Sequence, residues 1–176
     1  MSHQTSQIIT ASAVIFSCLF SGCGYTQRVV LPNNIRTIAV PTFEDQIPPK
    51  DRFAYRQGLE IELTNALRNR FIFDGNLKLV DEKDADAVLK GAIIGYQQEG
   101  VRFDTLESVE EYRLYLVVKF DLIDQRTGEI ILKESNFSGQ TEFFTSRNPT
   151  STRTSAASSS VEDLARNIVN RIIEEW

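Results

Sequence analysis

Strict alternation of apolar and mixed positions marks the stretch from Tyr112 to Ile123. Its even positions are all apolar, whereas its odd positions combine charged, aromatic and aliphatic side chains: Arg113, Tyr115, Val117, Lys119, Asp121 and Ile123. A period of two predicts a strand with one face in the core and the other against a wetter environment. Residues 125–128 (QRTG) predict a hairpin turn, and residues 129–144 predict the returning strand.

Three earlier apolar, β-branched stretches also predict strands, at residues 35–43, 77–80 and 87–103. In the first of them Pro41 limits the strand to a sheet edge or a bulge. Residues 44–52, with Pro48 and Pro49, predict a loop, and residues 81–86 predict an acidic loop.

Apolar positions three and four residues apart predict two amphipathic helices. The first lies between Tyr55 and Phe71 and is stopped by the DGN turn at residues 74–76. The second is expected over residues 161–176, where Ser159 and Glu162 fit a capping box. Between strand and helix, ten of the sixteen residues 145–160 are Ser or Thr, with two arginines and no acid. This composition predicts a flexible, locally cationic loop.

Together these elements predict an α/β (α+β) domain over residues 35–176. The expected architecture is a two-layer sandwich: a mainly antiparallel four-stranded sheet with two helices on one face. The order is β-α-β-β-β-α, with residues 77–80 and 87–103 counted as one strand.

The N-terminal segment predicts export. Ile8–Phe20 is an uncharged, largely apolar run of 13 residues, too short for a bilayer span and typical of a signal-peptide core. Small residues then precede Cys23, as at the cleavage site of bacterial lipoproteins, whose cysteine is acylated. We therefore expect a signal peptide at residues 1–22, a lipid on Cys23 and a tether at residues 23–34. Gly24 instead of Asp favours the outer membrane. The alternative is a short buried helix with a chance cysteine.

The composition argues against several classes of ligand and catalytic site. The net charge of −5 offers no global basic field for nucleic acid. The only His is His3, and both cysteines lie at or before position 23, so residues 24–176 lack the imidazole and thiol of a hydrolase triad or a typical zinc site. No phosphate-binding glycine motif occurs. We expect no metal, no cofactor and no enzyme, although a pair of carboxylates acting as acid and base stays open among 24 acidic residues.

Nearly the whole exported chain resembles the LptE family, the lipopolysaccharide-assembly lipoproteins of the outer membrane. The stretches that carry the resemblance are Cys23-Gly24-Tyr25, IRTIAVPTFED (35–45), LEIELTNALRNRFIFDGNLKLV (59–80), DADAVLKGAIIGYQQEGVRFD (84–104), EEYRLYLVVKFDLIDQRTGEIIL (110–132) and LARNIVNRIIEEW (164–176). The resemblance implies an α/β sandwich inside the barrel of the partner LptD, lipopolysaccharide as ligand, and no catalytic residues.

Phosphates and acyl chains of lipopolysaccharide call for Arg or Lys beside apolar surface. The candidates for contact with ligand or partner are Arg102, Arg113, Tyr115, Lys119, Arg147 and Arg153. For each, the alternative is an ordinary solvated side chain. At the level of the protein, the alternative is a lipoprotein that regulates a peptidoglycan synthase, because the stretch at 35–45 also suits such proteins. A lipid-anchored enzyme is disfavoured by composition.

Overall fold

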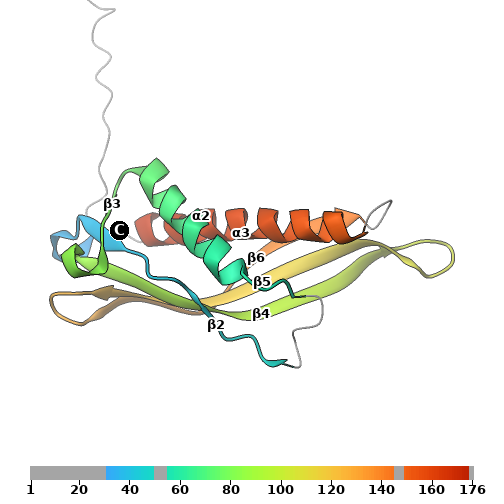
Figure 1. Ribbon diagram of the computed structural model, residues 1–176, viewed down its shortest axis with the longest axis horizontal. Helices are drawn as coiled ribbons and strands as arrows, with labels where there is room; N and C mark the ends of the chain where they lie inside the picture. Colours follow the sequence, from blue (N-terminus) through green and yellow to red (C-terminus); the bar gives the residue numbers. More distant parts are fainter. Residues whose placement is uncertain (1–30, 50–54, 145–148, 175–176) are drawn as a thin grey trace, which may run out of the picture.

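A computed structural model describes residues 31–49, 55–144 and 149–174 of the chain. One twisted sheet forms the lower layer in Figure 1, and two α-helices, α2 (Leu59–Asp74) and α3 (Pro149–Glu174), lie on its upper face. The predicted mixed α+β class with helices on one face is confirmed. Among the described helices, none combines the length and apolar character that a membrane crossing requires.

The described part of the sheet has six strands, so the predicted number of four is wrong. They are β1 (Thr37–Ala39), β2 (Glu44–Asp45), β3 (Lys78–Leu79), β4 (Ala87–Phe103), β5 (Val109–Asp124) and β6 (Ile130–Phe144). The order is β3-β1-β4-β5-β6, with β2 also paired to β4. The long pairs β4–β5 and β5–β6 are antiparallel, whereas β1 pairs in parallel with both β3 and β4.

The strand predicted at 35–43 is much shorter, because only β1 at 37–39 forms within it, and the loop predicted at 44–52 is wrong at its start, where β2 forms. The segment leaves the sheet after β1 at Pro41, which has no N–H to donate, and rejoins the edge of β4 as β2, where Glu44 lies opposite Ala92. Between the two strands the Phe43 N–H donates to the Thr64 hydroxyl at 2.9 Å. The Phe43 ring packs over Gly91, where a Cβ would lie 2.3 Å from a ring carbon. The buried ring therefore decides where the segment bends.

Residues 77–80 and 87–103 also form separate strands, because β1 lies between them. β3 pairs with one edge of β1 and β4 with the other. Two runs that are adjacent in sequence are thus separated in the sheet by a strand that comes about forty residues earlier in the chain.

The predicted core face of β5 is confirmed from Leu114 to Leu122, whereas Tyr112 at its start is only half-buried. Leu114, Leu116, Val118, Phe120 and Leu122 are at most 1% exposed. The stripes predicted to cover them are likewise buried and share their core cluster: Leu59, Leu63 and Leu67 of α2, and Ile168 and Ile172 of α3.

The loop predicted at 145–160 is wrong over most of its length, because α3 begins at Pro149, twelve residues before the expected start at 161. Proline suits a first helical position. Ala156, Ala157 and Ser160 are buried against the sheet, and at Gly139 of β6 a Cβ would lie 2.9 Å from the Cβ of Leu164. Small side chains permit this close packing, which offsets the low helix propensity of Ser and Thr. Ser159 and Glu162 consequently lie within the helix rather than at its cap.

Two aspartates join the first described segment to the strand ends. The Asp86 carboxylate accepts hydrogen bonds from the backbone N–H groups of Arg36 and Thr37, both at 3.0 Å, and from the Thr37 hydroxyl at 2.9 Å. The bond from the Arg36 N–H is the main reason that the pKa of Asp86 lies below its ordinary value, against the opposing effect of burial. Asp124, also with a lowered pKa, accepts the side-chain amide N–H of Asn33 at 3.0 Å.

These bonds predict an acid-dependent stability. Because the folded-state pKa of Asp86 lies below its unfolded value of about 3.9, its contribution is complete above that pH and is lost as pH falls through the folded pKa. Urea unfolding at a series of pH values should therefore show stability falling below about pH 4. Asp86→Asn should be less stable at pH 7 and show a shallower fall, with Asp124 supplying the remainder. An unchanged slope in Asp86→Asn would contradict this assignment.

Candidate partner-binding face

The described elements leave the sheet face opposite the helices uncovered along the middle of β4, β5 and β6 (Figure 1), whereas Val88 near the start of β4 is buried with Ala39 and Ala85. We call it the open face and define it by the strand residues that alternate with the core positions: Gln97, Glu99, Arg113, Tyr115, Val117, Lys119, Ser138, Gln140 and Glu142. It combines amides, charges and a few apolar groups. Lys119 is exposed, whereas Arg113, Tyr115 and Val117 are half-buried by their cross-strand neighbours.

Arg113 is held in a cross-strand ion pair. It lies opposite Glu142 of β6, and its Nε donates to Glu142 Oε1 at 2.9 Å. A side-chain hydrogen bond with Tyr115 and the bond to Glu142 raise the pKa of Arg113. The structure thus brings Arg113 and Tyr115 together, as the alternation predicts. It also supplies Arg113 with a carboxylate, so this residue presents a fixed planar group rather than a free charge.

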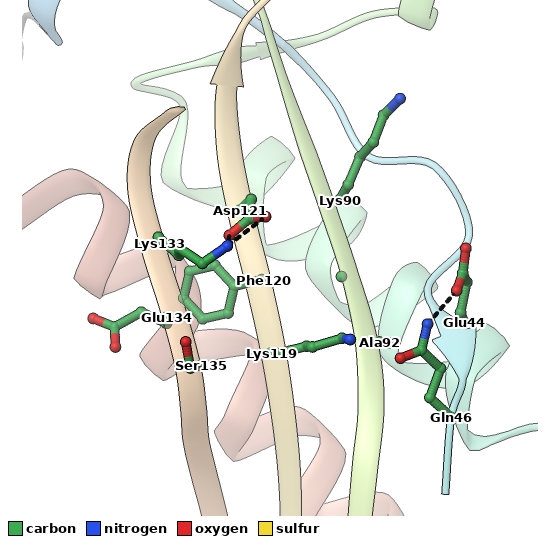
Figure 2. Close-up of a pocket in the computed structure, with 11 residues that line it drawn as sticks. Glu44, Gln46, Lys90, Ala92, Lys119, Phe120, Asp121, Lys133, Glu134 and Ser135 are labelled. Carbon is green, nitrogen blue, oxygen red and sulfur yellow. Dashed lines mark hydrogen bonds and ion pairs between the residues drawn. The ribbon is translucent and has the colours of Figure 1, made fainter. Parts of the chain in front are cut away.

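Lys119 differs from Arg113, because it forms no ion pair with any residue that the structure describes. Figure 2 shows it extending from β5 across β4, in a pocket of about 240 Å³. Lys133 lies in the same pocket but pairs with Asp121 at 3.3 Å, and Gln46 donates to Glu44 at 2.6 Å. Lys90 also lines this pocket and pairs with Glu82 at 3.0 Å, so Lys119 is the lysine of the pocket that is available to an acidic group of a partner.

Arg102 lies outside the open face proper, at the end of the β4–β5 hairpin. Its Nε is 3.4 Å from Glu111 Oε2, and its guanidinium carbon is 5.6 Å from the centre of the Phe144 ring. Phe103, Leu106 and Phe144 are 58%, 82% and 49% exposed. We call Arg102, Phe103, Leu106 and Phe144 the distal tip. The distal tip places a cation beside exposed apolar surface, which is the combination expected for contact with the phosphates and acyl chains of lipopolysaccharide.

The two remaining cationic candidates are placed differently. Arg153 is half-buried on α3, close enough to Tyr96 for its charge to act on that phenol, and its Nε has no hydrogen-bond partner among the described residues. It is therefore not a cation on a flexible loop. Arg147 and the predicted lipidation site Cys23 lie outside the described residues.

Sequence reasoning found the cation of the distal tip but missed its apolar part. Phe103 precedes, and Leu106 lies within, a turn in which Leu106 and Ser108 donate backbone N–H bonds to Asp104. The signal was an apolar residue inside a polar turn, FDTLES, which a soluble hairpin does not need. Within the described segments, no three His, Cys, Asp or Glu side chains are grouped as metal ligands.

Comparison with known proteins places this geometry in a family. Similar folds occur in a protein from Xanthomonas campestris (TM-score 0.56, 11% identity, covering 85% of this chain and 92% of that chain) and in a minor lipoprotein from Acinetobacter baumannii (TM-score 0.53, 18% identity, covering 80% and 92%). A search of curated protein sequences finds no match. The family model of LptE, described as lipopolysaccharide-assembly, matches residues 35–172. The chain therefore belongs to the LptE family of non-enzymatic lipopolysaccharide-assembly lipoproteins.

Proposed function

We propose that the protein is an outer-membrane lipoprotein that binds an LptD-type β-barrel through its open face and assists lipopolysaccharide assembly at the cell surface. The observation that carries this proposal is the one-sided layering of the fold. The two described helices cover one sheet face, and no described element covers the other face at Arg113, Tyr115, Val117 and Lys119. Such a mixture of polar, charged and apolar groups suits the polar lumen of a transmembrane barrel.

The distal tip is the proposed contact with lipopolysaccharide. An arginine can donate paired hydrogen bonds to a phosphate, and exposed aromatic and aliphatic side chains can contact acyl chains. The distal tip supplies a hydrogen-bond donor for phosphate and an apolar surface for acyl chains at one end of the molecule: the donor is Arg102, and the apolar side chains are Phe103, Leu106 and Phe144. Glu111 limits the free charge of Arg102, so part of the attraction to phosphate is offset before a ligand arrives.

The membrane attachment is proposed at Cys23, after removal of residues 1–22. The chain enters the described fold at Leu31, which is 1% exposed and belongs to the core. The seven residues 24–30 therefore connect the proposed lipid on Cys23 to Leu31, which is held in the core of the domain. This short connection keeps the domain at the membrane surface on the periplasmic side.

Lipid attachment can be tested directly. Mass spectrometry of the mature protein should find Cys23 acylated at a new N-terminus, and Cys23→Ala should leave the membrane fraction or keep its signal peptide. The conservative control is Cys18→Ala, which lies inside the predicted signal and should be processed and lipidated as the unchanged chain is. An unmodified Cys23 in the mature protein would rule out the anchor.

The binding proposal is tested by purification in mild detergent. The expected result is a large outer-membrane β-barrel at equal stoichiometry, together with loss of surface lipopolysaccharide when the protein is depleted. Co-purification of a peptidoglycan synthase, with altered cell-wall synthesis on depletion, would instead support the regulator. Purification alone under every condition would reject both.

A further inference from the structure

Two adjacent apolar side chains at the C-terminal end of α2 project into solvent. Ile72 is 65% exposed and Phe73 is 80% exposed, just before the helix ends at Gly75. The guanidinium carbon of Arg70 lies 5.3 Å from the centre of the Phe73 ring. We call Arg70, Ile72 and Phe73 the helix-end patch. Neither the core nor the open face uses these side chains.

The position of this patch relative to the chain entry is informative. In Figure 1 the C-terminal end of α2 and the blue segment that begins at Leu31 lie toward the same end of the molecule, whereas the β4–β5 hairpin lies at the other. Topology explains this, because β3 follows α2 after a short turn and pairs with β1, which follows Leu31 by a few residues. The patch and the entry point of the chain are therefore held together by the β1–β3 pair.

The length of the connection limits how far the lipid can be. Eight residue steps join Cys23 to Leu31, and a fully extended chain spans at most about 3.6 Å per residue, or roughly 29 Å in total. An acylated Cys23 consequently keeps this end of the domain within reach of the bilayer surface. The distal tip lies at the other end of the long axis and is therefore farther from the anchor than the patch is.

We propose that the helix-end patch rests in the headgroup region of the membrane that holds the lipid, and so orients the domain with its distal tip away from that surface. This inference rests on the proposed lipid anchor. Phe and Ile favour the boundary between headgroups and acyl chains, and an arginine beside them can reach lipid phosphate while its stem stays apolar. Two side chains are too few to hold a protein on a membrane alone. Once a lipid has anchored the chain, they need only select one orientation.

The alternative occupant of this patch is a second copy of the chain, and the small area of the patch argues against it. A stable interface buries about 1,200–2,000 Å² in total, whereas the patch offers two apolar side chains and one arginine. A planar bilayer has no such minimum, because the lipid supplies the binding and the patch supplies only the orientation.

The experiment uses the full lipidated protein in vesicles of phosphatidylethanolamine with a minor fraction of phosphatidylglycerol. Residues 24–176 contain no cysteine, so Asn69→Cys provides a single site for a polarity-sensitive fluorophore. Asn69 is exposed and precedes Ile72 and Phe73 by three and four residues, on the same helix surface. The matched control is Thr105→Cys, exposed beside Leu106 at the opposite end.

The label at position 69 should shift its emission to the blue and be quenched several-fold more strongly by a quencher on lipid headgroups than the label at position 105. Adding Ile72→Ser and Phe73→Ser should abolish that difference while urea unfolding stays unchanged, since both side chains are exposed. Equal quenching at the two positions would overturn the inference even though the protein remains on the vesicles. A protein that does not stay on vesicles would overturn the anchor itself. A shift at position 69 that appears without vesicles and grows with concentration would assign the patch to a second copy.

Discussion

Leu116→Ala is expected to lower the free energy of unfolding by about 2–5 kcal/mol, because it leaves a cavity that the neighbouring residues cannot fill. Leu116 is 1% exposed at the centre of β5, opposite Tyr96 of β4 and Gly139 of β6. Gly139 has no side chain to move into the space, and its close approach to Leu164 fixes the distance between α3 and the sheet. Urea unfolding of the isolated domain measures the change.

Lys119→Ala is the matched control for that measurement. It lies on the same strand but on the open face, where its side chain is exposed and pairs with no described residue. Its removal should change the free energy of unfolding by less than about 0.5 kcal/mol. Equal losses in the two variants would mean that the two faces of β5 have been assigned wrongly.

Val117→Trp combined with Lys119→Glu should weaken the proposed complex with the β-barrel by more than about tenfold while the isolated domain stays folded. A tryptophan adds bulk at the centre of the open face, and reversing a charge at a desolvated interface costs about 2–5 kcal/mol, well beyond a factor of ten. The fold should tolerate the larger side chain, because Gly95 lies opposite Val117 on β4 and has no side chain of its own on that face. Quantitative co-purification in mild detergent measures the loss.

A charge reversal elsewhere separates this effect from a change in net charge. Lys83→Glu carries the same change of charge in the short helical turn Glu82–Asp84, which contributes no residue to the open face, and should leave the complex intact. If Lys83→Glu weakens the complex as much as the open-face variant, long-range electrostatics rather than contact drives assembly. If neither variant weakens it, the open face is not the interface.

The sequence predicted most accurately what local periodicity determines. The even positions of β5 alternate strictly enough to assign their face, and the stripes of α2 and the second half of α3 repeat at helical spacing. The helix at residues 149–160 could not be predicted from periodicity, because it depends on close packing against Gly139. Its Ser and Thr residues carry no local signal for a helix. Pro41 was expected to limit the strand to an edge or a bulge, whereas it lies after β1 where the segment leaves the sheet, and the return as β2 depends on where the Phe43 ring fits.

Site chemistry was less predictable for a related reason. Arg113 and Arg102 were found as cations, yet their partners Glu142 and Glu111 are chosen by strand register, which connects residues that composition treats as independent. The exposure of Phe103 and Leu106 follows from how far the β4–β5 hairpin extends beyond the helices. Periodicity within one strand contains no information on that length.

The insertion of β1 between β3 and β4 constrains the order in which the molecule can fold. The β4–β5–β6 meander joins strands that are consecutive in sequence and has low contact order, so it can form early. β1 has no neighbour to pair with until β3 and β4, about forty and fifty residues later, have been delivered, and α3 closes the core only with the last residues. In a chain delivered N-terminus first, the segment of β1 is therefore the first to arrive and must wait for its partner strands. This apolar segment must be kept from aggregation for the whole of that interval.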